Sequence, residues 1–312
     1  MPRILVVAPN WIGDALMAQP LLTRLKQSGA ALEVLAPEWV APVMRRMPEV
    51  DQVISTPFRH GALQLGARWR VGRELGRRGY DQAIVLPNTW KSALVPFLAG
   101  IPVRTGYVGE LRYGLLNSIH KKTNSPMPLH YARLAGEARN ELPRPHLEVT
   151  PAEIAEATRR FGIEGRYVVL CPGAEYGPAK RWPYFRQLAE SLGTPVVLVG
   201  SANDREAAAT IPGKNLVGKT TLDEAIRLIA GAATVVSNDS GLMHVAAALG
   251  RPQVALFGSS SPEHTPPASA SARVLWLRLE CSPCFERECP LGHFRCMKEI
   301  TVEHVVAAMG SL

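Results

Sequence analysis

The strongest constraint on the fold is a repeated alternation of short apolar, strand-like runs with helical stretches. The first run is RILVVA at residues 3–8, and a polar, glycine-containing loop separates it from the apolar-periodic residues 15–27. Further runs at 31–36, 51–55 and 82–87 alternate with helical stretches around 37–47 and from about 63 to 78. Alternation at this spacing predicts a parallel sheet with helices on both of its faces.

A proline-rich segment divides the chain. Residues 141–151 (ELPRPHLEVTP) contain three prolines, which disfavour a continuous helix and are typical of a linker. Beyond it, strand-like runs at 166–171, 194–200, 234–238 and 252–258 again alternate with helical stretches. We predict two Rossmann-like, doubly wound α/β domains, 1–150 and 151–312, with ligands at the carboxyl ends of their strands and a cleft between the two sheets.

The excess of positive charge lies entirely in the first half. Residues 1–150 contain 19 Lys and Arg against 11 Asp and Glu, whereas residues 151–312 contain 16 of each. Such a field attracts anions such as phosphorylated lipid, nucleic acid or a membrane surface, although an ordinary solvated surface is the alternative. The chain shows neither a secretory signal pattern nor a run of eighteen apolar residues, so we expect a cytoplasmic protein.

The segment NDSGLMHVAAALG follows a strand-like run and leads directly into a helix. Amides near Ser240 and Gly241 would lie at the positive end of that helix, which suits a phosphate group. His244 lies one turn beyond Ser240, away from the expected apolar stripe, so it can face the same ligand. In the alternative interpretation, Asp239 or Ser240 only caps the helix and His244 is a surface histidine.

The loop CPGAEYGPAKRWP also follows a strand-like run, and it ends in Lys180 and Arg181. A rigid loop that holds a cation at this position fits a diphosphate, because the ammonium group would stabilise negative charge on a departing nucleotide. The alternative is a solvated charge pair before a helix with Pro183 in its first turn.

Asp14 follows the first strand of the other half, in PNWIGDALM. A carboxylate at the start of a helix is commonly an N-cap, which is the structural alternative. The functional interpretation is a general base that faces the diphosphate site across the cleft, a role that contributes about 10²–10⁴ in rate.

Four of the five cysteines lie close together near the C-terminus. Cys281, Cys284, Cys289 and Cys296 are separated by two, four and six residues, and His293 lies among them. Four soft ligands at such spacing could bind zinc or support an iron–sulfur cluster, as a structural metal only. Reduced thiols in a packed loop remain the alternative, and we expect no catalysis there.

Several common motifs are absent. The chain has no G-x-G-x-x-G after its first strand, no P-loop and no H-E-x-x-H, which disfavours dehydrogenases, P-loop NTPases and zinc proteases. Basic residues between 68 and 78 lack an accompanying helix-turn-helix or aromatic stacking platform. We therefore expect no nucleic-acid partner, and an anionic membrane or lipid acceptor is the better candidate.

Taken together, the motifs PNWIGDALMAQPLL, LPNTWKSALVPFLAGIPVRTGYVGELRYGLLN, PGAEYGPAKRWP and NDSGLMHVAAALGRP resemble the bacterial heptosyltransferases of glycosyltransferase family nine, in particular those of type II. The resemblance covers nearly the whole chain. It implies a GT-B fold and an inverting, metal-independent transfer of heptose from ADP-heptose. For type II, the acceptor is the first heptose of heptosyl-Kdo-lipid A, and types I and III are the alternatives within the family.

The resemblance also implies roles for individual residues. Asp14 corresponds to the catalytic base, with Asn10, Trp11, Gly13 and Lys91 on the acceptor side. The donor-binding residues would be Lys180, Arg181, Asn238, Asp239, Ser240, Gly241, Met243 and His244. The cysteine segment departs from the best-known enterobacterial members, so a metal-free description of this part of the chain does not follow from the resemblance.

The expected reaction is a single displacement. Asp14 would remove a proton from an acceptor hydroxyl, which attacks the anomeric carbon while ADP departs from the opposite face. Two other classes of function remain open from the residues: a nucleotide-sugar epimerase of similar architecture, and a non-catalytic module for membrane or partner binding built around the cysteine loop. No cofactor is expected to be required for catalysis, and peripheral contact with the inner-membrane surface is expected.

Overall fold

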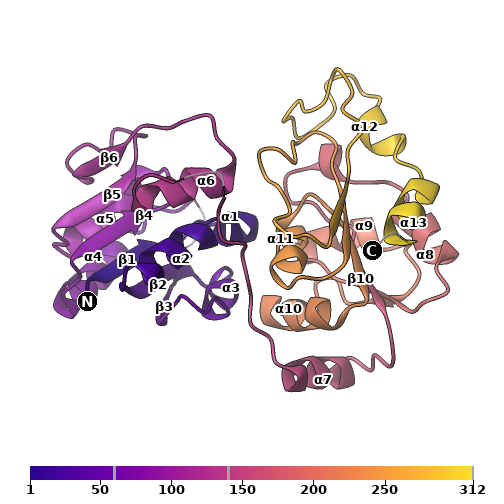
Figure 1. The fold of residues 1–312 in the computed structure, drawn as a ribbon, viewed down its shortest axis with the longest axis horizontal. Helices are drawn as coiled ribbons and strands as arrows, with labels where there is room; N and C mark the ends of the chain where they lie inside the picture. Colours follow the sequence, from indigo (N-terminus) through magenta and orange to yellow (C-terminus); the bar gives the residue numbers. More distant parts are fainter. Residues whose placement is uncertain (59–60, 139–140, 311–312) are drawn as a thin grey trace. The chain divides into compact units, whose positions relative to one another are not determined.

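The computed structural model describes residues 1–58, 61–138 and 141–310, which divide into two compact units. Unit 1 comprises Met1–Pro145 and unit 2 comprises His146–Leu312. The division therefore falls a few residues before the predicted boundary between 150 and 151, within the same proline-rich segment. Each unit is a sheet with helices packed on it (Figure 1).

Unit 1 contains a six-stranded sheet in the order β3-β2-β1-β4-β5-β6, and every pairing in it is parallel. Leu5, Val6 and Ile84 are fully buried, because helices cover both faces of the central strands. The strands are β1 (Arg3–Val7), β2 (Ala31–Pro37), β3 (Gln52–Thr56), β4 (Gln82–Val85), β5 (Val103–Tyr107) and β6 (Ser118–His120). The first four coincide with the predicted runs.

The helical stretch predicted at 15–27 is two helices, α1 (Ile12–Met17) and α2 (Gln19–Gln27). Pro20 lies in the first turn of α2 and has no N–H to donate to the preceding turn, so the hydrogen bonding of the helix is interrupted there. The other helices of unit 1 are α3 (Ala41–Arg45), α4 (Leu65–Leu75), η1 (Gly76–Arg78), α5 (Trp90–Leu98), α6 (Met127–Ala132) and η2 (Arg133–Ala135).

Unit 2 also contains a six-stranded parallel sheet, in the order β12-β11-β10-β7-β8-β9. Its strands are β7 (Val168–Cys171), β8 (Val196–Leu198), β9 (Lys214–Asn215), β10 (Thr234–Asn238), β11 (Gln253–Leu256) and β12 (Ala272–Leu275). Its helices are α7 (Pro151–Arg160), η3 (Pro178–Lys180), α8 (Phe185–Ser191), η4 (Ala202–Asp204), α9 (Arg205–Ala208), α10 (Leu222–Gly231), α11 (Gly241–Ala248), α12 (Arg295–Lys298) and α13 (Val302–Gly310).

Both sheets reverse their strand order at the centre. In unit 1 the chain moves outward from β1 in one direction through β2 and β3, and from β4 in the other through β5 and β6. In unit 2 the same reversal occurs between β7 and β10. Loops at the carboxyl ends of the two strands that flank such a switch point diverge, which leaves a crevice where ligands bind in doubly wound sheets. Ligand-binding residues are therefore expected in the loops after β1, β4, β7 and β10.

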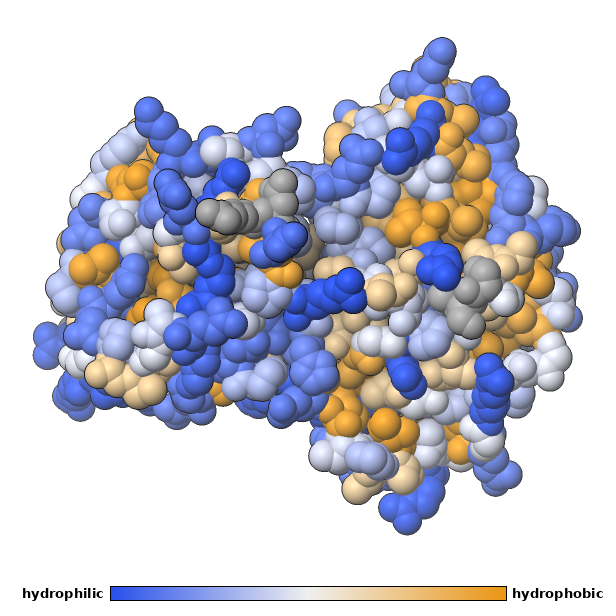
Figure 2. All heavy atoms as spheres, in the orientation of Figure 1, coloured by the Kyte–Doolittle hydropathy of each residue, from blue (hydrophilic) through white to orange (hydrophobic). Residues whose placement is uncertain are grey.

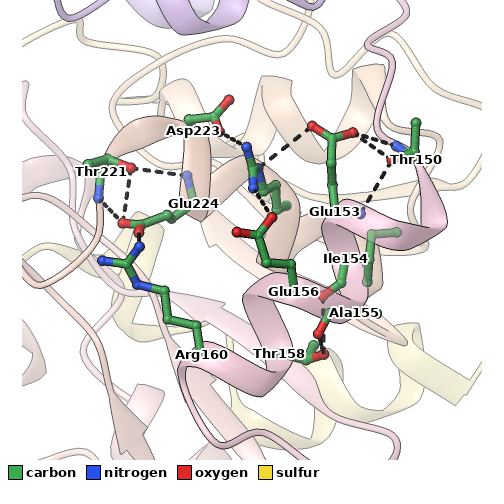
Figure 3. A network of polar contacts seen from close by, with 11 residues as sticks. Thr150, Glu153, Ile154, Ala155, Glu156, Thr158, Arg160, Thr221, Asp223 and Glu224 are labelled. Carbon is green, nitrogen blue, oxygen red and sulfur yellow. Dashed lines mark hydrogen bonds and ion pairs between the residues drawn. The ribbon is translucent and has the colours of Figure 1, made fainter.

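The start of unit 2 is secured by charge pairing between α7 and α10 (Figure 3). Thr150 and Thr221 each begin their helix with a capping box, in which the threonine and the glutamate three residues later satisfy each other's backbone N–H groups. Arg160 pairs with the capping Glu224 at 2.9 Å, and the Arg227 guanidinium contacts Asp223, Glu153 and Glu156. The capping and the ion pairs dock the first helix after the linker onto the body of unit 2.

Two helices of unit 1, α4 and α5, pack unusually closely. A Cβ atom on Gly72 would lie 2.7 Å from the Leu98 Cβ, and one on Gly76 would lie 2.9 Å from the Ala99 carbonyl oxygen, so glycine permits this approach.

Across the described residues, every helix falls short of the length and hydropathy that crossing a bilayer demands.

Candidate functional site

Three loops of unit 2 meet at the Asp239 carboxylate. Lys180, at the end of the loop after β7, places its Nζ 2.5 Å from Asp239 Oδ2. Ser260, in the loop after β11, donates its hydroxyl to the same oxygen at 2.5 Å. The Lys180 and Asp239 side chains are 16% and 5% exposed. The switch point of unit 2 therefore holds a largely desolvated cation whose position is fixed by a buried carboxylate.

Asn238 precedes Asp239, but its side chain faces the protein. Its side-chain oxygen accepts the backbone N–H of Trp182 at 3.0 Å, and its amide nitrogen donates to the Pro172 carbonyl at 2.8 Å. The residue is fully buried. Donor contact through the Asn238 side chain, as predicted, does not fit this geometry, because both polar atoms are used to hold the loop after β7 against β10.

Two residues of α11 also differ from the prediction. Met243 is fully buried and packs with Ala255, Phe257 and Trp276, so it belongs to the core and offers no ligand surface. His244 is only 6% exposed, so the surface-histidine alternative is wrong. The helix is buried around most of its circumference, whereas the sequence interpretation assumed a single apolar stripe.

The environment of His244 keeps its imidazole neutral. Burial, and secondarily the Lys180 charge, lower the pKa of His244 to about 4, although the Asp239 carboxylate opposes this shift. Near pH 7 the side chain is therefore uncharged and can only accept or donate hydrogen bonds.

Ser240 is the N-cap residue of α11, but its side chain makes no capping hydrogen bond. Its hydroxyl lies 3.2 Å from the Ser237 hydroxyl instead. Gly241 begins the helix, where the first-turn amides lack partners within the helix and carry its partial positive charge. The helix start lies next to Asp239, so the first-turn amides and the Lys180 ammonium lie at the same end of the sheet.

Arg181 is separated from this cluster. Its side chain lines a different cavity, together with Trp182, Arg186, Glu206 and Lys298. Among the described residues, the buried Arg181 Nε has no hydrogen-bond partner. The adjacent cations predicted as one donor-binding pair thus face two different places.

Asp14 lies at the switch point of unit 1. It is the third residue of α1, whose N-cap is Trp11, so the N-cap interpretation of Asp14 is wrong. The side chain is half-buried, and the Tyr131 hydroxyl donates to its Oδ1 at 3.1 Å. Burial, followed by the Asp14 charge, raises the pKa of Tyr131 well above its usual value. Tyr131 consequently remains a protonated donor to the carboxylate at any physiological pH.

Tyr131 itself is held in an aromatic cluster. It is 5% exposed and packs edge-on against His130, whose ring stacks on Tyr107 with the ring centroids 3.8 Å apart. The Tyr107 hydroxyl also donates to the His130 carbonyl. This cluster fixes α6 and with it the donor to Asp14.

The other predicted acceptor-side residues also flank the switch point of unit 1. The Asn10 carbonyl accepts the Trp39 indole N–H at 2.8 Å, and Trp11 is half-exposed beside it. Gly13 lies in the first turn of α1. Lys91 is in the first turn of α5, after β4, and its ammonium donates to the Gly61 carbonyl at 2.8 Å. Loops after β1 and β4 thus bring all of the predicted unit 1 residues to one end of the sheet.

Two residues of these sites, Ser260 and Tyr131, were not predicted from the sequence. Ser260 follows an apolar strand run, so the rule that ligand loops follow strands could have found it. Tyr131 lies in a stretch without a strong periodic pattern, and nothing in the sequence indicates that it reaches a residue 117 positions away.

Comparison with known proteins decides the family. The model for glycosyltransferase family 9 (heptosyltransferase) matches residues 68–295. Lipopolysaccharide heptosyltransferase 2 of Escherichia coli K12 is 42% identical, with 99% of this chain and 98% of that protein covered. The chain belongs to glycosyltransferase family 9. Lipooligosaccharide heptosyltransferase 2 of Haemophilus influenzae is 44% identical, with 88% of each chain covered.

The fold agrees with this family 9 assignment. The solved structure of E. coli ADP-heptose lipopolysaccharide heptosyltransferase II has a TM-score of 0.89 and 40% sequence identity, and the match covers 99% of this chain and 98% of that one. The predicted GT-B fold, two parallel doubly wound sheets, is therefore confirmed. The protein is a glycosyltransferase, which sets aside the epimerase and the non-catalytic module as alternatives.

Proposed function

We propose that this family 9 enzyme is a lipopolysaccharide heptosyltransferase of type II, which transfers heptose from ADP-heptose to the first heptose of heptosyl-Kdo-lipid A. The observation that carries the proposal is the similarity to E. coli heptosyltransferase 2 over nearly the full length of both chains. The clustering of chemically suitable residues at both switch points supports it. In this proposal, unit 2 binds the nucleotide sugar and unit 1 binds the acceptor.

Donor binding is assigned to the switch point of the unit 2 sheet, where the loops after β7 and β10 begin. The ADP diphosphate would accept hydrogen bonds from the first-turn amides of α11 near Ser240 and Gly241, and from the Lys180 ammonium. Asp239 and Ser260 keep Lys180 in place before the donor arrives, so little reorganisation is needed when negative charge grows on the leaving diphosphate.

Asp14 is assigned as the general base. Its carboxylate accepts the proton of an acceptor hydroxyl while the hydroxyl oxygen bonds to the anomeric carbon of the donor. The bond from that carbon to the diphosphate oxygen breaks on the opposite face, its electron pair leaves with ADP, and the configuration inverts. The proton moves to Asp14 and the negative charge to the diphosphate. We propose no cofactor for this step.

Tyr131 is assigned as a positioning residue for this base. Its hydroxyl donates to Oδ1 of Asp14 and so helps to set the orientation of the carboxylate. A hydrogen bond to the ionised carboxylate favours the charged form, so Tyr131 helps to keep Asp14 deprotonated between turnovers.

Unit 1 also carries a surface suited to an anionic membrane, which we call the α4 face. It consists of the exposed residues Leu65, Trp69, Arg70, Arg73 and Arg77. Arg73 lies over the Trp69 ring, with its Cζ 5.6 Å from the centroid, so basic and aromatic groups occupy one side of the helix. On the face shown in Figure 2, unit 1 is covered mainly by hydrophilic residues. We propose that the α4 face makes peripheral contact with the cytoplasmic side of the inner membrane, where the lipid acceptor resides.

A transfer assay tests the function directly. The purified enzyme is incubated with radiolabelled ADP-heptose and defined lipopolysaccharide cores that carry no heptose, one heptose or two heptoses. Incorporation into the one-heptose core alone is expected. Incorporation into the heptose-free core would assign type I instead, and incorporation into the two-heptose core would assign type III. Incorporation into none of the three cores would contradict the proposal.

The membrane proposal has its own test. Arg70→Glu combined with Arg73→Glu should abolish sedimentation with vesicles that contain anionic phospholipid, because each basic residue near such a surface contributes about 1 kcal/mol. Arg166→Glu, a charge change in unit 2, is the matched control. Equal sedimentation of both variants would refute the α4 face as the contact surface.

A further inference from the structure

The four clustered cysteines surround one small cavity. Cys281, Cys284, Cys289 and Cys296 all line it, and Ser259 and His293 contribute to the same lining. The cavity volume is about 20 Å³, and since a single water needs about 10–15 Å³, there is room for one ion. Residues up to fifteen positions apart thus converge on a space of ionic size.

The turn around Cys289 is built to stabilise a negatively charged sulfur. Phe294 donates its backbone N–H to the Cys289 Sγ at 3.4 Å. The backbone amides of Leu291, Gly292 and His293 also face this sulfur. Gly292, with φ +69°, allows the chain to wrap around the sulfur. Amides directed at a thiolate are the outer-shell support that metal-bound cysteines commonly have.

Cysteine thiolates are ligands that zinc and iron favour, and four of them complete a tetrahedral shell. His293 is less suited as a ligand, because its Nδ1 already accepts the Arg295 N–H at 3.0 Å.

We propose that Cys281, Cys284, Cys289 and Cys296 bind a single thiophilic cation, zinc or iron, in a tetrahedral site within unit 2. Within residues 1–58, 61–138 and 141–310 no three His, Cys, Asp or Glu side chains are grouped in ligating geometry as they stand. The cation would draw the four sulfurs inward until each lies about 2.3 Å from it.

The segment between these cysteines supports the donor loops, which gives the cation a positioning role. Phe285 donates its N–H to the Ser259 carbonyl at 2.7 Å, one residue before Ser260. The Arg287 carbonyl accepts the Ala179 N–H at 3.0 Å, one residue before Lys180. A Cβ on Gly177 would lie 2.6 Å from that Arg287 oxygen, so the two segments are in close contact.

A second polar contact, from the Tyr176 hydroxyl to the Phe285 carbonyl, ties the same two segments together. A cation that fixes Cys284 and Cys289 would therefore fix Phe285 and Arg287 between them, and through them the loops that carry Lys180 and Ser260. Only this positioning role rests on the proposed donor site; the cation site itself does not.

Metal content tests the site without reference to activity. The full-length enzyme, purified without added metal or chelator, should contain about one zinc or iron per chain by inductively coupled plasma mass spectrometry. Cys284→Ser should lower the content at least fivefold, whereas Cys171→Ala, which changes the buried cysteine of β7, should leave it unchanged. Wild-type protein with less than about 0.1 metal per chain, whether its thiols are free or joined in disulfides, would overturn the proposal.

Hydrogen exchange of wild-type protein tests the positioning role and avoids any variant that fails to fold. Treatment with a strong chelator should make the Ala179 and Phe285 amides exchange at least tenfold faster, and zinc or iron should restore their protection. Amides of β10 serve as the internal control and should not change. Metal removal without faster exchange at Ala179 would overturn the positioning role but leave both the cation site and the proposed transferase activity intact.

Discussion

The switch points of the two units use one topology for two kinds of chemistry. In unit 2, Lys180 and Ser260 both contact the Asp239 carboxylate. The Asn238 side chain holds the loop after β7 against β10. In unit 1, Asp14 is half-buried and Tyr131 holds one of its oxygens. The comparison teaches that a diphosphate site benefits from a cation that is fixed in advance, whereas a base must be oriented and yet remain exposed enough to meet its substrate.

The distribution of charge follows the same division. The excess of eight positive charges lies in residues 1–150, whereas residues 151–312 are balanced. Unit 1 can therefore attract a polyanionic acceptor over a distance of about the Debye length, while unit 2 relies on a few groups at short range.

The largest expected effect is that of Asp14→Asn. Asparagine can still accept the Tyr131 hydrogen bond but cannot take a proton, so kcat should fall about 10²–10⁴-fold. The Kd for ADP, measured by calorimetry, should change less than twofold. Glu38→Gln, an exposed acid in the same unit, is the control. An Asp14→Asn enzyme that retains wild-type kcat would exclude this residue as the base.

Lys180→Met should lower kcat/KM for the donor about 10²–10³-fold, because a preorganised cation is lost. It should also cost about 3 kcal/mol of unfolding free energy, since the buried Asp239 loses its ion-pair partner. Adding Asp239→Asn should recover most of the stability but none of the activity. Recovery of both would mean that Lys180 serves the fold only, and Lys219→Met provides the matched lysine control.

His244 makes the stability of unit 2 dependent on pH. Its pKa is lowered to about 4, so the unfolded chain takes up a proton below about pH 6.5 and the folded protein does not. The stabilisation is present above pH 6.5 and is lost as the pH falls towards 4, to a total of about 3 kcal/mol. Urea unfolding of His244→Gln should show a decline smaller by that amount, and parallel curves for the two proteins would contradict the account.

Tyr131→Phe should have a smaller effect. Loss of one hydrogen bond to the ionised carboxylate should reduce kcat about tenfold and shift the acid limb of the pH–rate profile to higher pH, because the pKa of the base rises. Its effect on the Kd for ADP should be negligible. Tyr113→Phe, at an exposed tyrosine of unit 1, is the control. An unshifted acid limb would assign Tyr131 a structural role alone.

Much of the fold follows from local pattern. The apolar runs at β1, β2, β7 and β10 are buried on both faces, and their spacing leaves room for crossover helices, so a parallel sheet was predictable. The short edge strands β6 and β9, with three and two residues, carry no such signal. The break between α1 and α2 depends on the single Pro20.

The site was predictable to the extent that it depends on strand ends. Lys180, Asp239 and Asp14 follow strands, and parallel strands bring such loops together. Side-chain direction was not predictable, since Asn238 and Met243 turn into the core while the neighbouring Asp239 meets Lys180. The partnership of Asp14 with Tyr131 depends on long-range packing of α6, which no local pattern encodes.

A crystal structure of the enzyme with ADP would test the central assignment most directly. The diphosphate is expected at the start of α11, with its oxygens within hydrogen-bond distance of Lys180 Nζ and the first-turn amides. A diphosphate bound instead in the cavity lined by Arg181, Arg186 and Lys298 would contradict the account.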